Sequence, residues 1–352
     1  MLTAQSIGSL PAPDEPESLM HTIYLIDQGL QLSKKSNRIV VKKEGKVSEE
    51  IPILELQRLL IFGNNQISTE LMRYLSSQGV EVAFLSSRGR FKFRLVPETS
   101  KNIYLRLAQH DRQRNTAFVL RFSQAIVAAK IHNQRTLLQR YQRNQPQIDL
   151  SDAITALLRS AQEVESKSDL EELRGLEGSS ARLYFAAYAR LLRGDFTFTR
   201  RQYYPAPDPV NALLSFGYML VHNELLGLLE AVGFDVFLGF FHGTRYGRAS
   251  LATDLLEDLR APVVDRLVLY LVNKGTIKPD QFQPDKEGRG VTMDNLALKT
   301  YLANYEKFME TPFQDQKTQK RQNFRAILRE KVLALERTLL HDVPYPPFRY
   351  FS

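Results

Sequence analysis

Four side chains in three separate segments of this chain have the chemistry of a divalent-cation site. They are Glu177, His242, Asp254 and Glu257. Carboxylates together with an imidazole suit a hard or borderline ion such as Mg²⁺ or Mn²⁺, and the histidine favours competence with Mn²⁺. Acids that hold a cation inside a basic chain indicate phosphodiester chemistry on a nucleic acid.

The spacing within the last segment supports a shared site. Asp254 and Glu257 are three residues apart, so a helix would place both carboxylates on one face. His242 comes from a glycine-rich loop just before that helix, whereas nothing local links Glu177 to the other three. A plainer interpretation stays open, because acids early in a helix favour its dipole and often face solvent. A single histidine, likewise, is often structural.

Other catalytic classes have little support in the sequence. The chain has no cysteine, which excludes thiol nucleophiles, disulfides and thiolate zinc sites. It also contains no Gly-x-Ser-x-Gly element, no phosphate-binding loop and no Gly-x-Gly-x-x-G fingerprint. A metal-assisted reaction is therefore favoured over covalent catalysis by the protein.

The balance of charge favours a polyanionic partner. Lysine and arginine outnumber aspartate and glutamate by 47 to 39, a formal net charge of +8. The candidates for contact with DNA phosphates are Lys130, Arg182, Arg245 and Arg248. Arg245 and Arg248 lie in the loop that follows His242, which places them near the proposed site. Ordinary surface charge is the alternative interpretation of each.

Composition and length are those of a globular protein with two domains. Of the 352 residues, 43% are hydrophobic, and no apolar run is long enough to span a bilayer. We therefore expect no membrane partner. The absence of cysteine fits a cytoplasmic location.

Sequence texture divides the chain into four parts. Residues 1–20 lack apolar patterning and are expected to be a disordered leader, with Met20 an alternative start to Met1. Residues 21–97 are rich in strand patterns, residues 98–102 form a polar linker, and residues 103–352 carry long helical patterns. The fold class predicted is α+β, with a small β-rich N-terminal domain followed by a larger all-α catalytic domain.

Individual elements follow from periodicity and from turn residues. Strands are expected at 22–26, 38–42, 51–53, 80–85 and 91–95, and short helices at 54–60 and 68–78. Longer helical segments are expected at 105–141 (one helix or two), 148–165, 170–193, 210–232, 250–272, 296–309 and 318–340. A bend is expected at Pro262, and the proline-rich tail after 342 is expected to pack as an extended strip.

Several motifs in order resemble one known family. The segments Leu-Glu-Gly-x-x-Ala-Arg-x-Tyr-Phe (176–185), Asp-Pro-Val-Asn-Ala-Leu-Leu-Ser-Phe-Gly-Tyr (208–218) and Gly-Phe-Phe-His, followed by Arg-Ala-Ser-Leu-Ala-Thr-Asp-Leu-Leu-Glu-Asp-Leu-Arg-Ala-Pro (239–262), are similar to its metal motifs and central helix. Ala-Lys-Ile-x-Asn-Gln at 129–134 agrees as well. The family is the CRISPR-associated integrase and endonuclease of spacer acquisition, CRISPR-associated protein one. The resemblance covers roughly residues 21–348.

The resemblance implies an activity and a set of partners. It implies metal-dependent insertion of short foreign DNA, the spacer precursor, into a CRISPR repeat by attack of a 3′-OH on a phosphodiester. It further implies a β-rich domain used for dimerisation, a homodimer, and a small ferredoxin-like partner subunit. By matched position, Glu177, His242 and Glu257 are the metal ligands, and Asp254 lies in or near the site.

Two alternatives and two departures accompany the resemblance. Ala261 interrupts the Arg-Pro common in the family, and Thr253 replaces a small apolar residue, but neither is a proposed ligand. The two alternative functions are a structure-selective DNA nuclease without integration and a non-catalytic DNA-binding scaffold. Products of the reaction separate the first alternative, and metal dependence separates the second.

Overall fold

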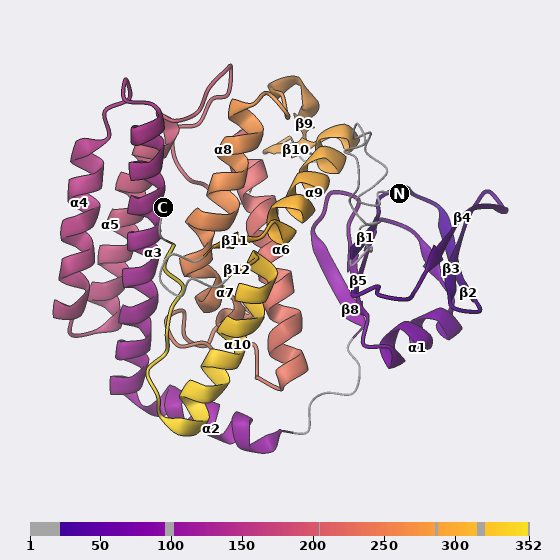
Figure 1. The fold of residues 1–352 in the computed structure, drawn as a ribbon, viewed down its shortest axis with the longest axis horizontal. Coiled ribbons are helices and arrows are strands. Elements are labelled where there is room, and N and C mark those ends of the chain that lie inside the picture. The colour runs from indigo at the N-terminus through magenta and orange to yellow at the C-terminus, as the bar shows by residue number, and fades with distance from the viewer. Residues whose placement is uncertain (1–21, 96–101, 204, 286–287, 315–320, 351–352) are drawn as a thin grey trace. The chain divides into compact units, whose positions relative to one another are not determined.

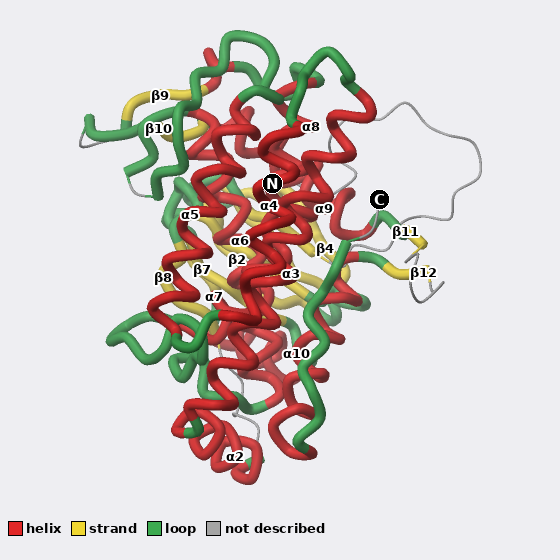
Figure 2. Tube along the Cα trace, turned by 90° about the vertical axis from the view of Figure 1, so that its left-hand side faces the viewer, coloured by secondary structure: helices red, strands yellow, loops and turns green. Residues whose placement is uncertain are grey.

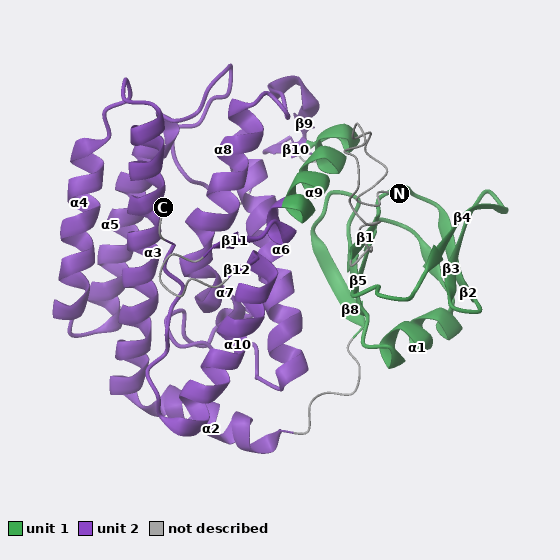
Figure 3. Ribbon diagram, viewed as in Figure 1, with its two compact units in different colours: residues 1–99, 293–307 green, residues 100–292, 308–352 purple. Residues whose placement is uncertain are grey.

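The chain forms two compact units (Figure 3). The computed structural model describes residues 22–95, 102–203, 205–285, 288–314 and 321–350. The first unit comprises residues 1–99 and 293–307, and the second comprises residues 100–292 and 308–352. The expected leader at 1–20 and nearly all of the expected linker lie outside the described residues.

Two four-stranded sheets make up most of the first unit. The first sheet has the strand order β1-β5-β7-β8 and the second β4-β3-β2-β6. Their strands are β1 Thr22–Leu25, β2 Leu30–Lys35, β3 Arg38–Lys43, β4 Lys46–Pro52, β5 Arg58–Phe62, β6 Gln66–Ile67, β7 Glu81–Leu85 and β8 Phe91–Leu95. In the first sheet, β1, β5 and β7 are parallel and β8 closes the edge antiparallel. The predicted β-rich domain is confirmed.

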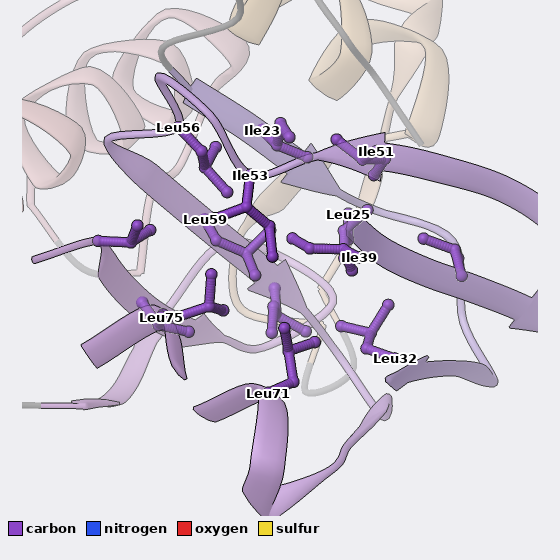
Figure 4. Close-up of a cluster of buried hydrophobic side chains, with 14 of the residues drawn as sticks. Ile23, Leu25, Leu32, Ile39, Ile51, Ile53, Leu56, Leu59, Leu71 and Leu75 are labelled. Atoms are coloured by element: carbon purple, nitrogen blue, oxygen red, sulfur yellow. The ribbon is translucent and has the colours of Figure 1, made fainter. Parts of the chain in front are cut away.

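Branched aliphatic side chains from both sheets fill the core of this unit (Figure 4). Ile23 on β1 is paired with Leu59 on the neighbouring strand β5 of the first sheet, and Ile39 comes from the second sheet. The helix α1 (Thr69–Ser77) adds Leu71 and Leu75, both fully buried. The helix begins there because Ser68 caps it by accepting the backbone N–H of Leu71.

One predicted helix in this unit is wrong. The sequence at 54–60 was expected to be helical, but β5 (Arg58–Phe62) is a central strand with all five residues buried. A strand between two parallel neighbours is covered on both faces, so it reads as a continuous apolar run without alternation. Such a run is easily mistaken for a short buried helix. The strand β2 was also missed, because its second half is polar and shows little strand pattern.

Helices dominate the second unit (Figure 1). They are α2 Ile103–Arg114, α3 Thr116–Asn144, α4 Ser151–Glu163, α5 Leu170–Ala189, α6 Pro209–Val232, α7 Ser250–Leu256, α8 Arg266–Asn273 and α10 Phe324–His341. The predicted helical region is thereby confirmed. A short hairpin, β9 (Phe282–Pro284) with β10 (Val291–Met293), interrupts it. Two further short strands, β11 (Phe313–Gln314) and β12 (Arg321–Gln322), pair before α10.

The helix α9 (Asn295–Glu310) departs from the predicted division of the chain. Residues 293–307 group with the β-rich unit, although the sequence pattern attached them to the helical region. Lys299 lies 3.8 Å from Asp27, and the hydroxyl of Tyr24 donates to Glu306. These contacts join most of α9 to β1 and the turn that follows it.

The helices α3, α4 and α5 pack side by side, and α3 also contacts the segment that follows α7. The helix α6 is the core helix of the unit. Asp208 caps it and Gly233 ends it in a left-handed conformation. Within the described residues, α6 is the one helix long and apolar enough to cross a membrane, and 72% of its apolar window is buried inside the protein.

The segment that carries the predicted acids is a broken helix. The helix α7 (Ser250–Leu256) continues as a 3₁₀ turn, η2 (Glu257–Leu259), then as a π-helical turn, η3 (Arg260–Asp265), before α8. The π turn contains Pro262, which cannot donate the regular hydrogen bond. Instead of one helix with a bend, the chain therefore changes its helical period just where the acids lie.

The tail after α10 packs as the extended strip that was expected. Residues 342–350 have no regular secondary structure (Figure 2). The strip is held to α3, because Asn133 donates to the carbonyl of Phe348 and accepts from the N–H of Tyr350. The tail thus covers the side of α3 that faces η2.

Candidate active site

Lys130 lies at the centre of the candidate site. Its ammonium is 2.5 Å from Oε1 of Glu177 and 2.6 Å from Oε2 of Glu257. The lysine comes from α3, and its two partners come from α5 and η2. The packing of α3 against both elements brings these three residues together.

Burial makes these charges strongly dependent on one another. The side chain of Glu257 is 3% exposed, that of Lys130 9% and that of Glu177 21%. Burial alone would lower the pKa of Lys130, but the carboxylates of Glu257 and Glu177 raise it above the usual value. The ammonium therefore keeps its charge within the protein. Glu177 marks the edge of the site that is open to solvent.

Arg260 fixes the second carboxylate from the other side. Its Nε and Nη2 atoms each lie 3.0 Å from one oxygen of Glu257, a bidentate pair across three residues of the chain. Burial would raise the pKa of Glu257, but Arg260 and Lys130 together lower it well below the usual range. Glu257 is accordingly a permanently charged oxygen donor.

His242 faces Glu257 and is oriented by Asp254. The Nδ1 atom of His242 lies 2.6 Å from Oδ1 of Asp254, and its Nε2 atom lies 3.7 Å from Oε1 of Glu257. Because a carboxylate only accepts, the hydrogen of the neutral imidazole resides on Nδ1. The lone pair on Nε2 then points toward the Glu257 side, the arrangement in which a histidine serves as a metal ligand.

Asp254 also holds the backbone that carries His242. It is fully buried, and its two oxygens accept the N–H groups of Phe240, Phe241 and His242 at 2.6, 3.1 and 3.0 Å. Gly239 permits this approach, because a Cβ there would lie 2.6 Å from Cβ of Ser250 and 3.0 Å from Oδ2 of Asp254. The Gly-Phe-Phe-His motif is thus wrapped around one buried carboxylate.

Asp258 points away from the site. It is fully buried and accepts two hydrogen bonds from the ammonium of Lys331, at 2.6 and 2.7 Å. It also accepts the N–H of Phe348 at 2.8 Å, while Asn133 donates to its carbonyl at 2.6 Å. The two adjacent acids therefore have different partners: Glu257 pairs with Lys130 on α3 and Asp258 with Lys331 on α10.

A second buried acid, Asp265, supports Arg260 through Tyr218. Asp265 accepts hydrogen bonds from the hydroxyls of Tyr184, at 2.7 Å, and of Tyr218. Burial raises the pKa of Asp265 to about 6. The guanidinium of Arg260 lies 4.5 Å from the ring centre of Tyr218, a cation–π contact. This cluster places a rigid aromatic surface under the arginine that orients Glu257.

The predicted phosphate contacts occupy different environments. Arg182 on α5 and Arg245 in the loop after His242 are exposed, and Arg248 is half-buried. Lys130, assigned to the same role from the sequence, is instead buried against the two glutamates. The exposed arginines are available to a polyanion, whereas the lysine ammonium already has two anionic partners.

The described residues contain no ready-made group of three His, Asp or Glu side chains that would hold a metal ion. The structure nevertheless brings Glu177 and Glu257 together on the ammonium of Lys130, and it places Nε2 of His242 3.7 Å from Oε1 of Glu257. Arg260 was not predicted to be a partner of Glu257, although the spacing of three residues between them was a usable signal. Asp265 and its tyrosines were not predicted either, because no local pattern connects them.

Comparison with known proteins agrees with this architecture. The sequence profile of the family described as CRISPR associated protein Cas1 matches residues 23–307. A CRISPR-associated endonuclease Cas1 of Rhodospirillum rubrum is 33% identical over 301 residues, which are 82% of this chain and 86% of that protein.

Solved structures extend the similarity to the fold. A casposase bound to its integration product superposes with a TM-score of 0.81 at 20% identity, over 95% of this chain and 96% of that one. A chain of a Cas6-RT-Cas1–Cas2 complex superposes with a TM-score of 0.80 at 22% identity, over 97% of this chain but 37% of that longer one. At these identities the likeness shows a common fold.

Proposed function

This chain belongs to the CRISPR-associated protein Cas1 family, and from that membership we propose that it is a metal-dependent DNA endonuclease and integrase. Its reaction inserts short foreign DNA fragments into a CRISPR array, as part of antiviral defence in the cytoplasm. The observation that carries the proposal is that Glu177 and Glu257 share one cation, the ammonium of Lys130, and that Nε2 of His242 lies 3.7 Å from Oε1 of Glu257.

The donor set fits a divalent ion. Two carboxylates and one imidazole nitrogen suit Mg²⁺ or Mn²⁺, and three protein donors leave coordination positions open for phosphate oxygens and water. The ammonium of Lys130 acts as a stand-in cation, since it is bound by both carboxylates. Glu177, Glu257 and His242 would therefore hold the ion.

The remaining residues position these donors. Asp254 keeps the hydrogen of His242 on Nδ1, and Arg260 holds both oxygens of Glu257 in place. A bound divalent ion supplies Lewis-acid stabilisation of the negative charge that develops during attack of a DNA 3′-OH on a phosphodiester. The exposed Arg182 and Arg245 are assigned to the DNA backbone.

The partners proposed follow from the family and its structural neighbours. A neighbour was solved as part of a complex with Cas2, and another was bound to an integration product. We accordingly assign to this chain a homodimer that binds a small ferredoxin-like partner subunit and acts on spacer-precursor and repeat DNA. No membrane partner is proposed.

The test is a strand-transfer assay with the partner subunit, a labelled DNA fragment and a repeat-containing target. Glu177→Ala, His242→Ala and Glu257→Ala are each expected to lose nearly all joined product while folding is kept. The matched control is Asp195→Asn, an exposed acid of the same unit, which should retain wild-type activity. Cut ends without joined strands would favour the structure-selective nuclease. Activity in EDTA would refute metal dependence.

A further inference from the structure

We infer that Lys130 is a resident counter-ion of the site, which occupies the cation position in the metal-free protein and is displaced when a divalent ion binds. This rests on the proposed function, because it concerns the same carboxylates. It adds a positioning role for a residue that sequence patterns assigned only to phosphate contact.

The ammonium of Lys130 occupies the carboxylates that the metal ion would use. The ammonium is bound at 2.5 Å by Glu177 and at 2.6 Å by Glu257, and these are the two carboxylates assigned to the metal. An ion coordinated by the same two carboxylates would lie close beside the ammonium. Two cations held by one pair of carboxylates within a buried site repel each other strongly, because the local dielectric is low. The lysine and the ion therefore compete.

In the protein without metal, Lys130 neutralises the buried carboxylates. The side chain of Glu257 is 3% exposed, and Glu177 lies on the same ammonium. Burying carboxylates together without a cation is costly. Arg260 pairs with Glu257, whereas Lys130 pairs with both carboxylates, so Lys130 offsets part of that cost and keeps the two donors from α5 and η2 close together. The site is thus assembled before the ion arrives.

The displaced ammonium can move toward the side of the site that is open to solvent. Glu177 is 21% exposed, so the site opens toward solvent on that side. An ammonium on a flexible four-carbon stem reaches this opening by rotating its terminal bonds. There it would lie beside the ion, where a DNA phosphate binds. The same lysine then serves the metal ligands in one state and the substrate phosphate in the other.

A second buried lysine in the same unit provides a matched control. Lys331 is 3% exposed and donates two hydrogen bonds to Asp258, the acid next to Glu257. Like Lys130 it is buried and paired with a carboxylate, but its single partner acid points away from the site. Replacing it should alter stability without freeing a metal ligand.

The decisive experiment titrates Mn²⁺ into the metal-free full-length protein and follows free Mn²⁺ by electron paramagnetic resonance. Lys130→Met is expected to bind Mn²⁺ about tenfold more tightly than wild type or better, because the binding-competent state no longer requires displacement of the lysine. Lys331→Met should match wild type. Equal or weaker binding by Lys130→Met would overturn the inference while leaving the metal site intact. Absence of binding in wild type and variant alike would refute the metal site itself.

A measurement on the wild-type protein covers the case in which Lys130→Met fails to fold. Amine-reactive labelling followed by mass spectrometry should find Lys130 protected in EDTA and reactive in Mn²⁺. Lys331 should stay protected in both conditions. Equal protection of Lys130 with and without Mn²⁺, at concentrations where Mn²⁺ binds, would show that the ammonium is not displaced.

Discussion

Replacement of Asp254 by asparagine should disable the site without removing a proposed metal ligand. The carboxylate is fully buried and accepts four hydrogen bonds: Oδ2 accepts the N–H groups of Phe240 and Phe241, and Oδ1 accepts the N–H and Nδ1 of His242. Asparagine keeps the shape but replaces one oxygen by an NH₂ group. Two donors must then face another donor.

The size of the effect follows from those four contacts. A buried donor left without an acceptor costs about 1–3 kcal/mol. Two such donors give an expected loss of about 2–6 kcal/mol in the free energy of unfolding, a large part of the stability of an ordinary domain. If the NH₂ group faces His242, the ring also loses the acceptor that keeps its hydrogen on Nδ1. Metal binding and strand transfer should then fall together.

The assay pairs urea unfolding with Mn²⁺ titration of Asp254→Asn and of the exposed control Asp195→Asn. The control should stay within about 0.5 kcal/mol of wild type. Strand transfer by Asp254→Asn should fall by at least about tenfold, the rate equivalent of about 1.4 kcal/mol. A variant with wild-type Mn²⁺ affinity and a stability loss below about 1 kcal/mol would refute the reasoning, since Asp254 would then hold neither the loop nor the imidazole.

Three further predictions concern other parts of the helical unit. Gly239→Ala should lower both stability and strand transfer, because its Cβ would lie 2.6 Å from a neighbouring side chain, whereas the open helical Gly175→Ala should be neutral or stabilising by up to about 1 kcal/mol in thermal unfolding. The pKa of Asp265 is raised to about 6, so the folded protein retains a proton that the unfolded chain loses at lower pH. Stability should therefore fall as pH rises from about 4 to 6, by on the order of 2–3 kcal/mol, and urea unfolding of Asp265→Asn should lack this part of the slope. Replacing Arg182 and Arg245 together by alanine should lower the slope of log affinity against log salt for duplex DNA by about 1 to 2, and an unchanged slope would remove them from the phosphate contacts.

Sequence patterns were sufficient for most elements of the fold. Helix α1 was expected at 68–78 and runs from Thr69 to Ser77, because a serine cap and a terminal glycine mark both ends. The error at 54–60 has a physical cause, since the buried central strand β5 lacks the alternation that identifies a strand at a surface. The alternation of apolar and polar residues identifies an element that has one face in solvent, so it cannot identify an element that is buried on every side.

The site shows a different limit. The family resemblance assigned Glu177, His242 and Glu257 to one site, and in the structure Glu177 and Glu257 share one ammonium while His242 lies beside Glu257. Lys130 was assigned to a phosphate, because a lysine near polar residues in a basic chain favours a polyanion. Sequence records that a side chain is charged, but the role of the charge depends on its burial and its partners, which are set by helices far apart in the chain.

The adjacent acids Glu257 and Asp258 show why partners decide function. Both are buried, and a helical wheel cannot separate them. At Glu257 the helix tightens to a 3₁₀ turn, and the two carboxylates then face different helices, each with its own lysine. Burial lowers the pKa of Lys331 and raises that of Asp258, whereas Glu257, with an arginine as well as a lysine, has a lowered pKa. We propose a structural role for the Lys331–Asp258 pair. Glu257 has two cationic partners and lies near the partly exposed Glu177, and it is the carboxylate that we propose exchanges its lysine for a metal ion.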